Sequence, residues 1–338
     1  MTWLYTLSFW AMVQLPEGNL GLIFLPFAII WNVLFNLYFL PKHDYYKRIL
    51  LVGVLSLFSI YLVANNMFND NPVFKGVVWW FAFFLFLLFD VRKDLAKQLV
   101  QALTVALFVL VLDTLYRVSL VEGVDVVANY YVYKKNSLLG VDSNVAGLYG
   151  VVCFSLLMAY RKVLSRSQLV IFGWGLFVLI VLTLSKAAVL SVLVLLSYSY
   201  LRRTAFCVVS VLSIFMLFFI AINNESGSSK FDLLRLSFEF VEMSSYVDLV
   251  FGLGLGRVVF LENGLTPHLL ALQLILYLGV VGVVLYFAMW IGSFFASGGR
   301  LMYLFIPYML ISLSFSPLGF PPLVYAILFF VRYKKVVA

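Results

Sequence analysis

Residues 168–222 read QLVIFGWGLFVLIVLTLSKAAVLSVLVLLSYSYLRRTAFCVVSVLSIFMLFFIAI. Within this stretch the charged residues are Lys186, Arg202 and Arg203 alone. An apolar run of about 20 residues crosses a bilayer as a helix, and a shorter run does so where the membrane thins or neighbouring helices support it. The stretch therefore predicts three consecutive membrane-spanning helices, over residues 168–184, 186–201 and 204–222.

The same pattern extends along the whole 338-residue chain, of which 64% is hydrophobic and 11% charged. Because too little polar sequence remains for a soluble domain, we expect one integral membrane domain over residues 1–338, an all-α bundle of about twelve transmembrane helices. The predicted spans are residues 2–15, 20–40, 49–65, 73–89, 98–116, 143–160, 168–184, 186–201, 204–222, 268–295, 301–315 and 319–331. Cys153 and Cys207 fall inside spans, so no disulfide framework is expected.

Basic residues are unevenly divided between the loops. Fifteen of the 23 Lys and Arg residues lie in alternate loops that hold only three acidic residues, and the other loops hold the remaining eight. Because cytoplasmic loops of membrane proteins are enriched in Lys and Arg, the basic side is expected to be cytoplasmic, with both termini inside. The net charge of +8 then follows from topology, and no nucleic-acid partner is expected.

The longest polar interval, residues 223–267, is placed outside the cytoplasm by this topology, in the periplasm of a Gram-negative cell. Apolar residues recur there every three or four positions, which predicts an amphipathic helix on the outer surface, with a stripe made of Phe231, Leu234, Phe238 and Val241. Arg235 and Glu239 lie four residues apart on that helix. A solvated ion pair is the simpler role for both, and contact with a substrate is the alternative.

Two further features follow the predicted helix. Residues 251–257 read FGLGLGR, and alternating glycines can expose backbone amides to an anion beside Arg257. Thr266-Pro267-His268 then begins the next span, with an N-cap residue and a proline at the first helical position. The positive end of the helix dipole favours a neutral His268 that can accept a proton. A histidine that only packs at the interface is the alternative.

Other polar residues lie near predicted span ends on the same side. Residues 130–135 read YYVYKK, and Lys134 and Lys135 with their tyrosines are typical of an aromatic belt with headgroup contacts, or of a platform that binds sugar and phosphate. Asp142 or Asn144 is placed to cap the next helix. Lys186 is either a snorkelling side chain or an anion ligand within the bundle.

Several of these residues resemble the motifs of one family. Arg235, then residues 251–256, then His268-Leu269-Leu270 and finally the glycine-containing residues 278–282 follow one another as in the O-antigen polymerase and O-antigen ligase family. Residues 140–144, GVDSN, resemble its Asp-x-Asn element, and Ser185-Lys186 resembles its Ser-Arg element. The likeness covers residues 138 to 295. Leu269 replaces the usual Asn, and Lys186 replaces an Arg, which keeps the charge but loses bidentate phosphate geometry.

This resemblance implies a GT-C-like membrane glycosyltransferase of the bacterial inner membrane. It would join undecaprenyl-diphosphate-linked oligosaccharide repeat units into O-antigen or capsular polysaccharide on the periplasmic face, with a chain-length regulator as a further partner. His268 and Arg235 become the candidate catalytic residues, His268 as the base. The remaining candidate substrate-binding residues are Lys186, Arg257, Lys134, Lys135, Glu239, Asp142 and Asn144.

No cofactor or metal ion is expected, because cations can stabilise a diphosphate leaving group and no outward Asp-x-Asp cluster offers hard oxygen ligands. Glu122 and Asp125 are the one loose candidate pair, and solvation is their simpler role. Two alternatives stay open. An O-antigen ligase would use the same donor and transfer the glycan to lipid A–core. A lipid-linked oligosaccharide flippase or other transporter would instead carry charged residues and broken helices near the bilayer midplane.

Overall fold

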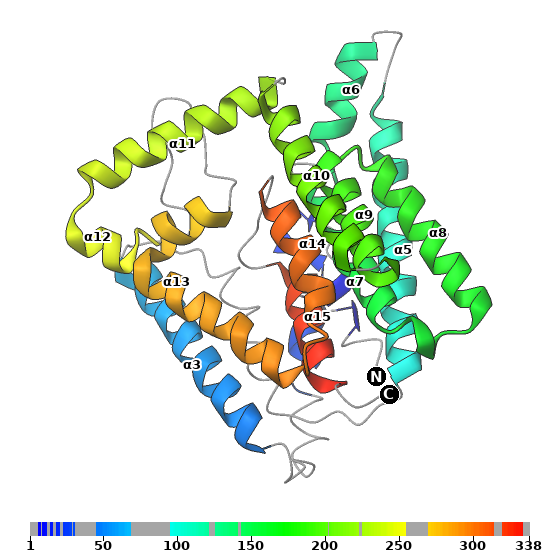
Figure 1. Ribbon diagram of the computed structural model, residues 1–338, viewed down its shortest axis with the longest axis horizontal. Coiled ribbons are helices and arrows are strands. Elements are labelled where there is room, and N and C mark those ends of the chain that lie inside the picture. The colour runs from blue at the N-terminus through cyan, green and yellow to red at the C-terminus, as the bar shows by residue number, and fades with distance from the viewer. Residues whose placement is uncertain are drawn as a thin grey trace.

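The computed structural model describes residues 6–7, 9–11, 14–15, 18–20, 23–28, 30, 45–68, 95–121, 126–140, 143–201, 203–222, 225–254, 270–313 and 320–333. Over these ranges the fold is all-α (Figure 1). Its helices are α3 (Tyr45–Phe68), α5 (Leu95–Ser119), α6 (Val126–Lys135), α7 (Ser143–Ala159), η2 (Arg161–Val163), α8 (Arg166–Leu182), α9 (Lys186–Tyr200), α10 (Arg203–Ile222), α11 (Glu225–Met243), α12 (Tyr246–Phe251), α13 (Leu270–Ala296), α14 (Met302–Ser312) and α15 (Pro321–Arg332).

The predicted spans over 49–65, 98–116 and from 143 to 331 all coincide with helices, whereas 73–89 lies outside the described residues. The prediction for 2–15 is wrong at its end, because β1 (Gln14–Leu15) pairs antiparallel with β2 (Gly18–Asn19). Leu15 precedes Pro16, and a proline ring pushes the residue before it out of the helical region. Helix α6 lies in a segment for which no helix was predicted.

Two described helices, α5 and α13, are long and apolar enough to cross a membrane. Seven shorter apolar stretches of helix accompany them, at 50–65, 143–159, 166–182, 186–200, 206–216, 302–312 and 321–332.

Helix α7 lies inside the bundle and contacts α5, α8, α9, α14 and α15. It is buried along almost its whole length, as expected for a helix that is apolar on every face. Small residues let its neighbours approach closely. A Cβ atom at Gly150, for example, would lie 2.5 Å from Cγ1 of Ile180 on α8.

Loops that were predicted to share the cytoplasmic side meet at one end of the bundle. There the Tyr333 hydroxyl donates to Oε1 of Gln98 at 2.6 Å, and Nη1 of Arg300 donates to the Tyr333 carbonyl at 3.3 Å. The Arg161 guanidinium lies 4.3 Å from the ring centre of Tyr200. The alternation of loops between two ends is therefore confirmed for these segments. Helices α6 and α11 lie at the other end, at the top of Figure 1.

Helix α13 is broken at Gly279, whose φ of 58° and ψ of −173° are not helical. The segment after α12 fills the break: the amides of Leu253 and Gly254 donate to the carbonyls of Leu276 and Tyr277, at 2.9 and 3.0 Å. Helix α3 also contacts this break, because the Tyr61 hydroxyl lies within hydrogen-bond distance of the carbonyl oxygens of Phe251 and Leu278. This junction fastens α12 to α3 and α13.

The anion-binding role expected for the glycine-rich residues 251–257 is contradicted for the described part of that segment. The amide of Gly252 donates to the Asp248 carbonyl at 2.7 Å, and the next two amides donate to α13. These donors are therefore already used within the protein. The alternating glycines instead allow close contact between backbones, because Gly252 and Gly254 have φ values of 74° and 82°.

We predict that Gly279→Ala destabilises the protein. A Cβ atom at this position would lie 2.5 Å from the amide nitrogen of Gly252, and the left-handed backbone alone costs a non-glycine residue about 1–3 kcal/mol. Thermal unfolding in detergent measures the effect. The control is Gly53→Ala on α3, where a Cβ atom meets nothing within 4 Å and alanine favours the helix. Equal unfolding temperatures for the two variants would contradict the prediction.

Candidate functional site

The predicted site residues that the structure describes lie in three places. Lys134 and Lys135 are on α6, Asn144 and Lys186 are in the first turns of α7 and α9, and Arg235 and Glu239 are on α11. Arg257, His268 and Asp142 lie outside the described residues, so their roles stay predictions.

Asn144 and Ser185 bring two of the motif segments together. Ser185 is the N-cap of α9 and accepts a hydrogen bond from the Ala188 amide. Its Oγ atom also donates to Oδ1 of Asn144, 41 positions earlier in the chain, at 2.8 Å. Of the two residues expected to cap α7, Asn144 does not do so, because it lies inside the helix, after Ser143; Asp142 lies outside the described residues. Its carboxamide instead joins the starts of α7 and α9.

Close packing at Gly147 makes this contact possible. A Cβ atom on Gly147 would lie 2.8 Å from the Cβ atoms of both Ser185 and Ala188. Any larger residue would push the first turn of α7 away from the start of α9. The Asn144–Ser185 hydrogen bond therefore depends on a glycine one turn further along α7.

The turn from α8 to α9 is conformationally strained. Leu184 has a φ of 57°, and no other non-glycine residue in the described ranges has a left-handed φ. The turn is held on its N-terminal side by Thr183, whose hydroxyl donates to the Ile180 carbonyl at 2.7 Å and accepts from the Ser185 amide at 3.3 Å. Strain of this kind persists only where the surroundings enforce it, and it concentrates at functional sites.

Lys186 is an electrostatically costly residue at this position. It is the first residue of α9 and is exposed, so its ammonium group lies at the positive end of that helix dipole. The first turn of α7 adds a second helix N-terminus through the Asn144–Ser185 contact. Within the described ranges no acidic side chain forms an ion pair with Lys186. An anionic group would be favoured here by the ammonium group and by both helix ends.

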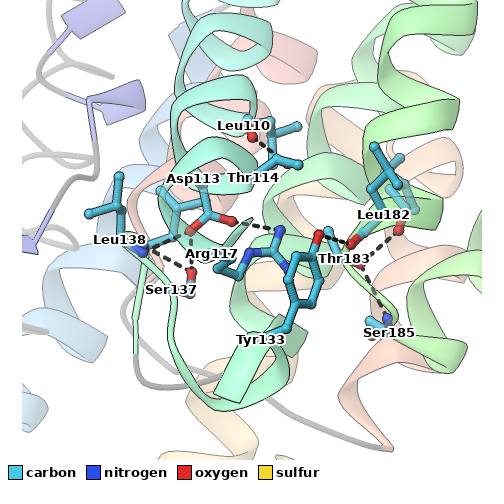
Figure 2. Close-up of polar contacts among 12 residues, drawn as sticks. Leu110, Asp113, Thr114, Arg117, Tyr133, Ser137, Leu138, Leu182, Thr183 and Ser185 are labelled. Carbon is cyan, nitrogen blue, oxygen red and sulfur yellow. Dashed lines mark hydrogen bonds and ion pairs between the residues drawn. The ribbon is translucent and has the colours of Figure 1, made fainter. Parts of the chain in front are cut away.

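A buried ion pair lies beside this turn and was not foreseen as a pair from the sequence (Figure 2). Nη2 of Arg117 lies 2.8 Å from Oδ2 of Asp113, and neither side chain has any exposed surface. Neither residue is among the candidate site residues that the sequence suggests. Their spacing of four residues in an apolar helix is the signal that could have identified the pair.

The pair contacts its surroundings in two directions, through hydrogen bonds to Asp113 and through a cation–π contact of Arg117. Oδ1 of Asp113 accepts from the Ser137 hydroxyl and from the Leu138 amide, at 2.7 and 2.8 Å. The Arg117 guanidinium lies 4.6 Å from the ring centre of Tyr133, whose hydroxyl donates to the Leu182 carbonyl at 2.6 Å. Burial raises the pKa of Tyr133, although the charge of Arg117 opposes the rise. The phenol therefore stays protonated and remains a donor at neutral pH.

The two lysines of α6 lie over tyrosines of the same helix. Nζ of Lys134 is 6.0 Å from the ring centre of Tyr130, and Nζ of Lys135 is 5.7 Å from that of Tyr131. Because the lysines lie over ring faces on which a sugar would stack, this arrangement favours the aromatic-belt interpretation over a sugar platform.

Helix α11 confirms the predicted helix in the long polar interval, with a shifted buried stripe. Ser237 is only 1% exposed and Phe238 is 66% exposed. The buried face of the helix therefore contains Ser237, where Phe238 was expected. Arg235 and Glu239 lie 3.6 Å apart and are 73% and 53% exposed, which is the solvated ion pair of the simpler interpretation. No hydrogen bond or ion pair within the described ranges connects Arg235 to the Asn144–Ser185 contact.

No family model matches the chain, and no curated protein or solved structure matches it significantly. No group of three His, Cys, Asp or Glu side chains suited to a metal ion occurs in the part of the chain that the structure describes.

We predict measurable coupling between Asn144 and Ser185. Ser185→Ala removes both the helix cap and the tertiary hydrogen bond, so it should cost about 1–2 kcal/mol for the cap alone. In a double-mutant cycle with Asn144→Ala, the coupling energy should be about 0.5–3 kcal/mol. Ser165 is the matched control, because it caps α8 and bonds to Gln168. Coupling of Ser165→Ala to Asn144→Ala as large as that of Ser185→Ala would argue against a specific contact.

Proposed function

We propose that this chain is a GT-C-like, polytopic glycosyltransferase of the bacterial inner membrane. In this proposal it joins undecaprenyl-diphosphate-linked oligosaccharide repeat units into O-antigen or capsular polysaccharide on the periplasmic face. The observation that carries the proposal is the hydrogen bond between Asn144 and Ser185. It supports the resemblance because two short motifs, identified separately in the sequence, form one contact beside the exposed Lys186.

Exposed apolar surface supports the membrane part of the proposal. On α8, Ile171 and Trp174 are 64% and 66% exposed, and on α10, Phe215 and Phe219 are 67% and 68% exposed. Apolar faces of this size need an apolar partner, and lipid chains provide one. The basic residues gathered at the opposite end from α6, including Arg161 and Arg300, fit a cytoplasmic leaflet there.

The chemistry follows from the charge of the donor. Breaking an anomeric bond to diphosphate requires that the charge developing on the leaving group be stabilised. Lys186 and the N-termini of α7 and α9 supply positive potential at one place, with Arg235 and Arg257 as the additional cations of the proposal. His268 would take the proton from the incoming sugar hydroxyl, and direct attack would invert the anomeric configuration.

We expect the reaction to be metal-independent, because fixed cations replace the ion that would otherwise neutralise the diphosphate. Purified protein assayed with and without EDTA should elongate the glycan at the same rate. A rate that falls in EDTA and returns when Mg²⁺ or Mn²⁺ is added would overturn this expectation.

The decisive test is elongation of a defined lipid-linked repeat unit by purified protein in liposomes. His268→Ala should lower the rate by about 10²–10⁴-fold. Lys186→Gln should lower it, whereas Lys186→Arg should retain activity because the charge remains. Lys162→Gln, in η2 near the opposite end of the bundle, is the control and should be as active as the wild type. Normal polymer from His268→Ala, or none from the wild type, would contradict the proposal.

A lipid-linked oligosaccharide carrier is the second candidate, and one observation favours it. Helix α13 is broken at Gly279, and broken helices are a feature of transporters. The same liposomes separate the candidates. Translocation of the lipid-linked unit without elongation identifies a carrier, elongation identifies a polymerase, and transfer to added lipid A–core identifies a ligase.

A further inference from the structure

We propose that Asp113 and Arg117 are positioning residues, which hold the starts of α7 and α9 against each other and so fix Lys186. The effect on KM rests on the proposed function, whereas the positioning of α7 and α9 by the pair does not. The two charged side chains are completely buried, and a buried ion pair usually gives a protein no more stability than apolar side chains of the same size would. The contacts that the pair makes point to a specific role.

Asp113 reaches the start of α7 through residues 137–140. Its Oδ1 atom binds the Ser137 hydroxyl and the Leu138 amide. This segment packs on the first turn of α7, because a Cβ atom at Gly140 would lie 2.9 Å from Cγ2 of Val145. Val145 is the neighbour of Asn144, so the carboxylate fixes the segment against which the Asn144 turn rests.

Arg117 reaches the start of α9 through Tyr133. The guanidinium lies over the phenol ring, and the phenol hydroxyl donates to the carbonyl of Leu182, the last residue of α8. Only the strained turn at Leu184 separates this carbonyl from Ser185. The phenol therefore restrains the end of α8 from which Ser185 and Lys186 continue.

The pair is the common anchor of both connections. Nε and Nη1 of Arg117 are buried and have no hydrogen-bond partner in the described ranges. Arg117 is thus oriented by Asp113 on one side and by the Tyr133 ring on the other (Figure 2). If the pair is removed, α5 no longer fixes the position of Asn144 or that of Ser185.

The first test replaces both charges with apolar side chains of similar length, Asp113→Leu together with Arg117→Met. Either single variant would leave an unpaired buried charge and would endanger folding, whereas the double variant removes that cost. We expect a folded protein whose unfolding temperature is lowered, because the Ser137 hydroxyl and the Leu138 amide lose their acceptor. The KM for the lipid-linked donor should rise by about 10- to 100-fold, with a smaller change in kcat. A folded double variant with the wild-type KM would overturn the inference.

Tyr133→Phe provides a milder second variant, since it removes only the hydroxyl that binds Leu182. It should raise the KM in the same direction as the double variant, without lowering the unfolding temperature to a comparable extent. Tyr200→Phe is the matched control, because Tyr200 lies at the other end of the bundle beside Arg161. Equal KM values for the two tyrosine variants would count against the connection through Tyr133.

A cross-linking test does not depend on the enzymatic proposal. Asn144→Cys and Ser185→Cys are introduced together after Cys153 and Cys207 have been replaced by alanine, and disulfide formation under mild oxidation is timed. The parent should cross-link readily, and the Asp113→Leu/Arg117→Met background should do so about 10-fold more slowly or worse. Slower cross-linking supports positioning even if no glycan is elongated. Equal rates, or a parent that does not cross-link, would overturn it.

Discussion

Pairing of polar groups inside an apolar bundle is the constraint on which the irregular parts of this structure depend. Where α13 breaks at Gly279, its freed carbonyls accept hydrogen bonds from the amides that follow α12. Where α8 turns into α9, the Thr183 hydroxyl and the Ser185 side chain occupy the backbone groups of the turn. Without water to satisfy them, such groups cost several kcal/mol each. Both of these departures from regular helix are therefore accompanied by specific hydrogen-bond partners.

Much of the fold could be predicted from the sequence, because long apolar runs leave few alternatives to helix. What could not be predicted are features that depend on two distant segments at once. Gly279 resembles any glycine in an apolar helix, and its break is understandable only beside Gly252, 27 residues earlier. Helix α6 was not predicted, because its tyrosines followed by two lysines are also typical of an interfacial loop. On α11 the helical period was right, but the buried side chain is Ser237 in place of Phe238.

The sequence identified several candidate site residues, but it did not predict which of them contact one another. Asn144 and Lys186 were identified from short motifs, yet nothing in those motifs indicates that Asn144 would bind Ser185 across to α9. Arg235, by contrast, has the exposed partner that simple helix spacing predicts. The pair of Asp113 and Arg117 is not among the predicted site residues, although its spacing of four residues inside an apolar helix would have indicated it.

The two glycines at the junction of α12 and α13 constrain how this chain can change. Each occupies the space that a side chain on the other would need, so neither position can gain a Cβ atom while the backbones remain in contact. A chimaera that joins residues before 254 from one parent to residues after 276 from another would therefore need glycine at both sites. In recombination or design, the two glycines must therefore be kept together, although they lie far apart along the chain.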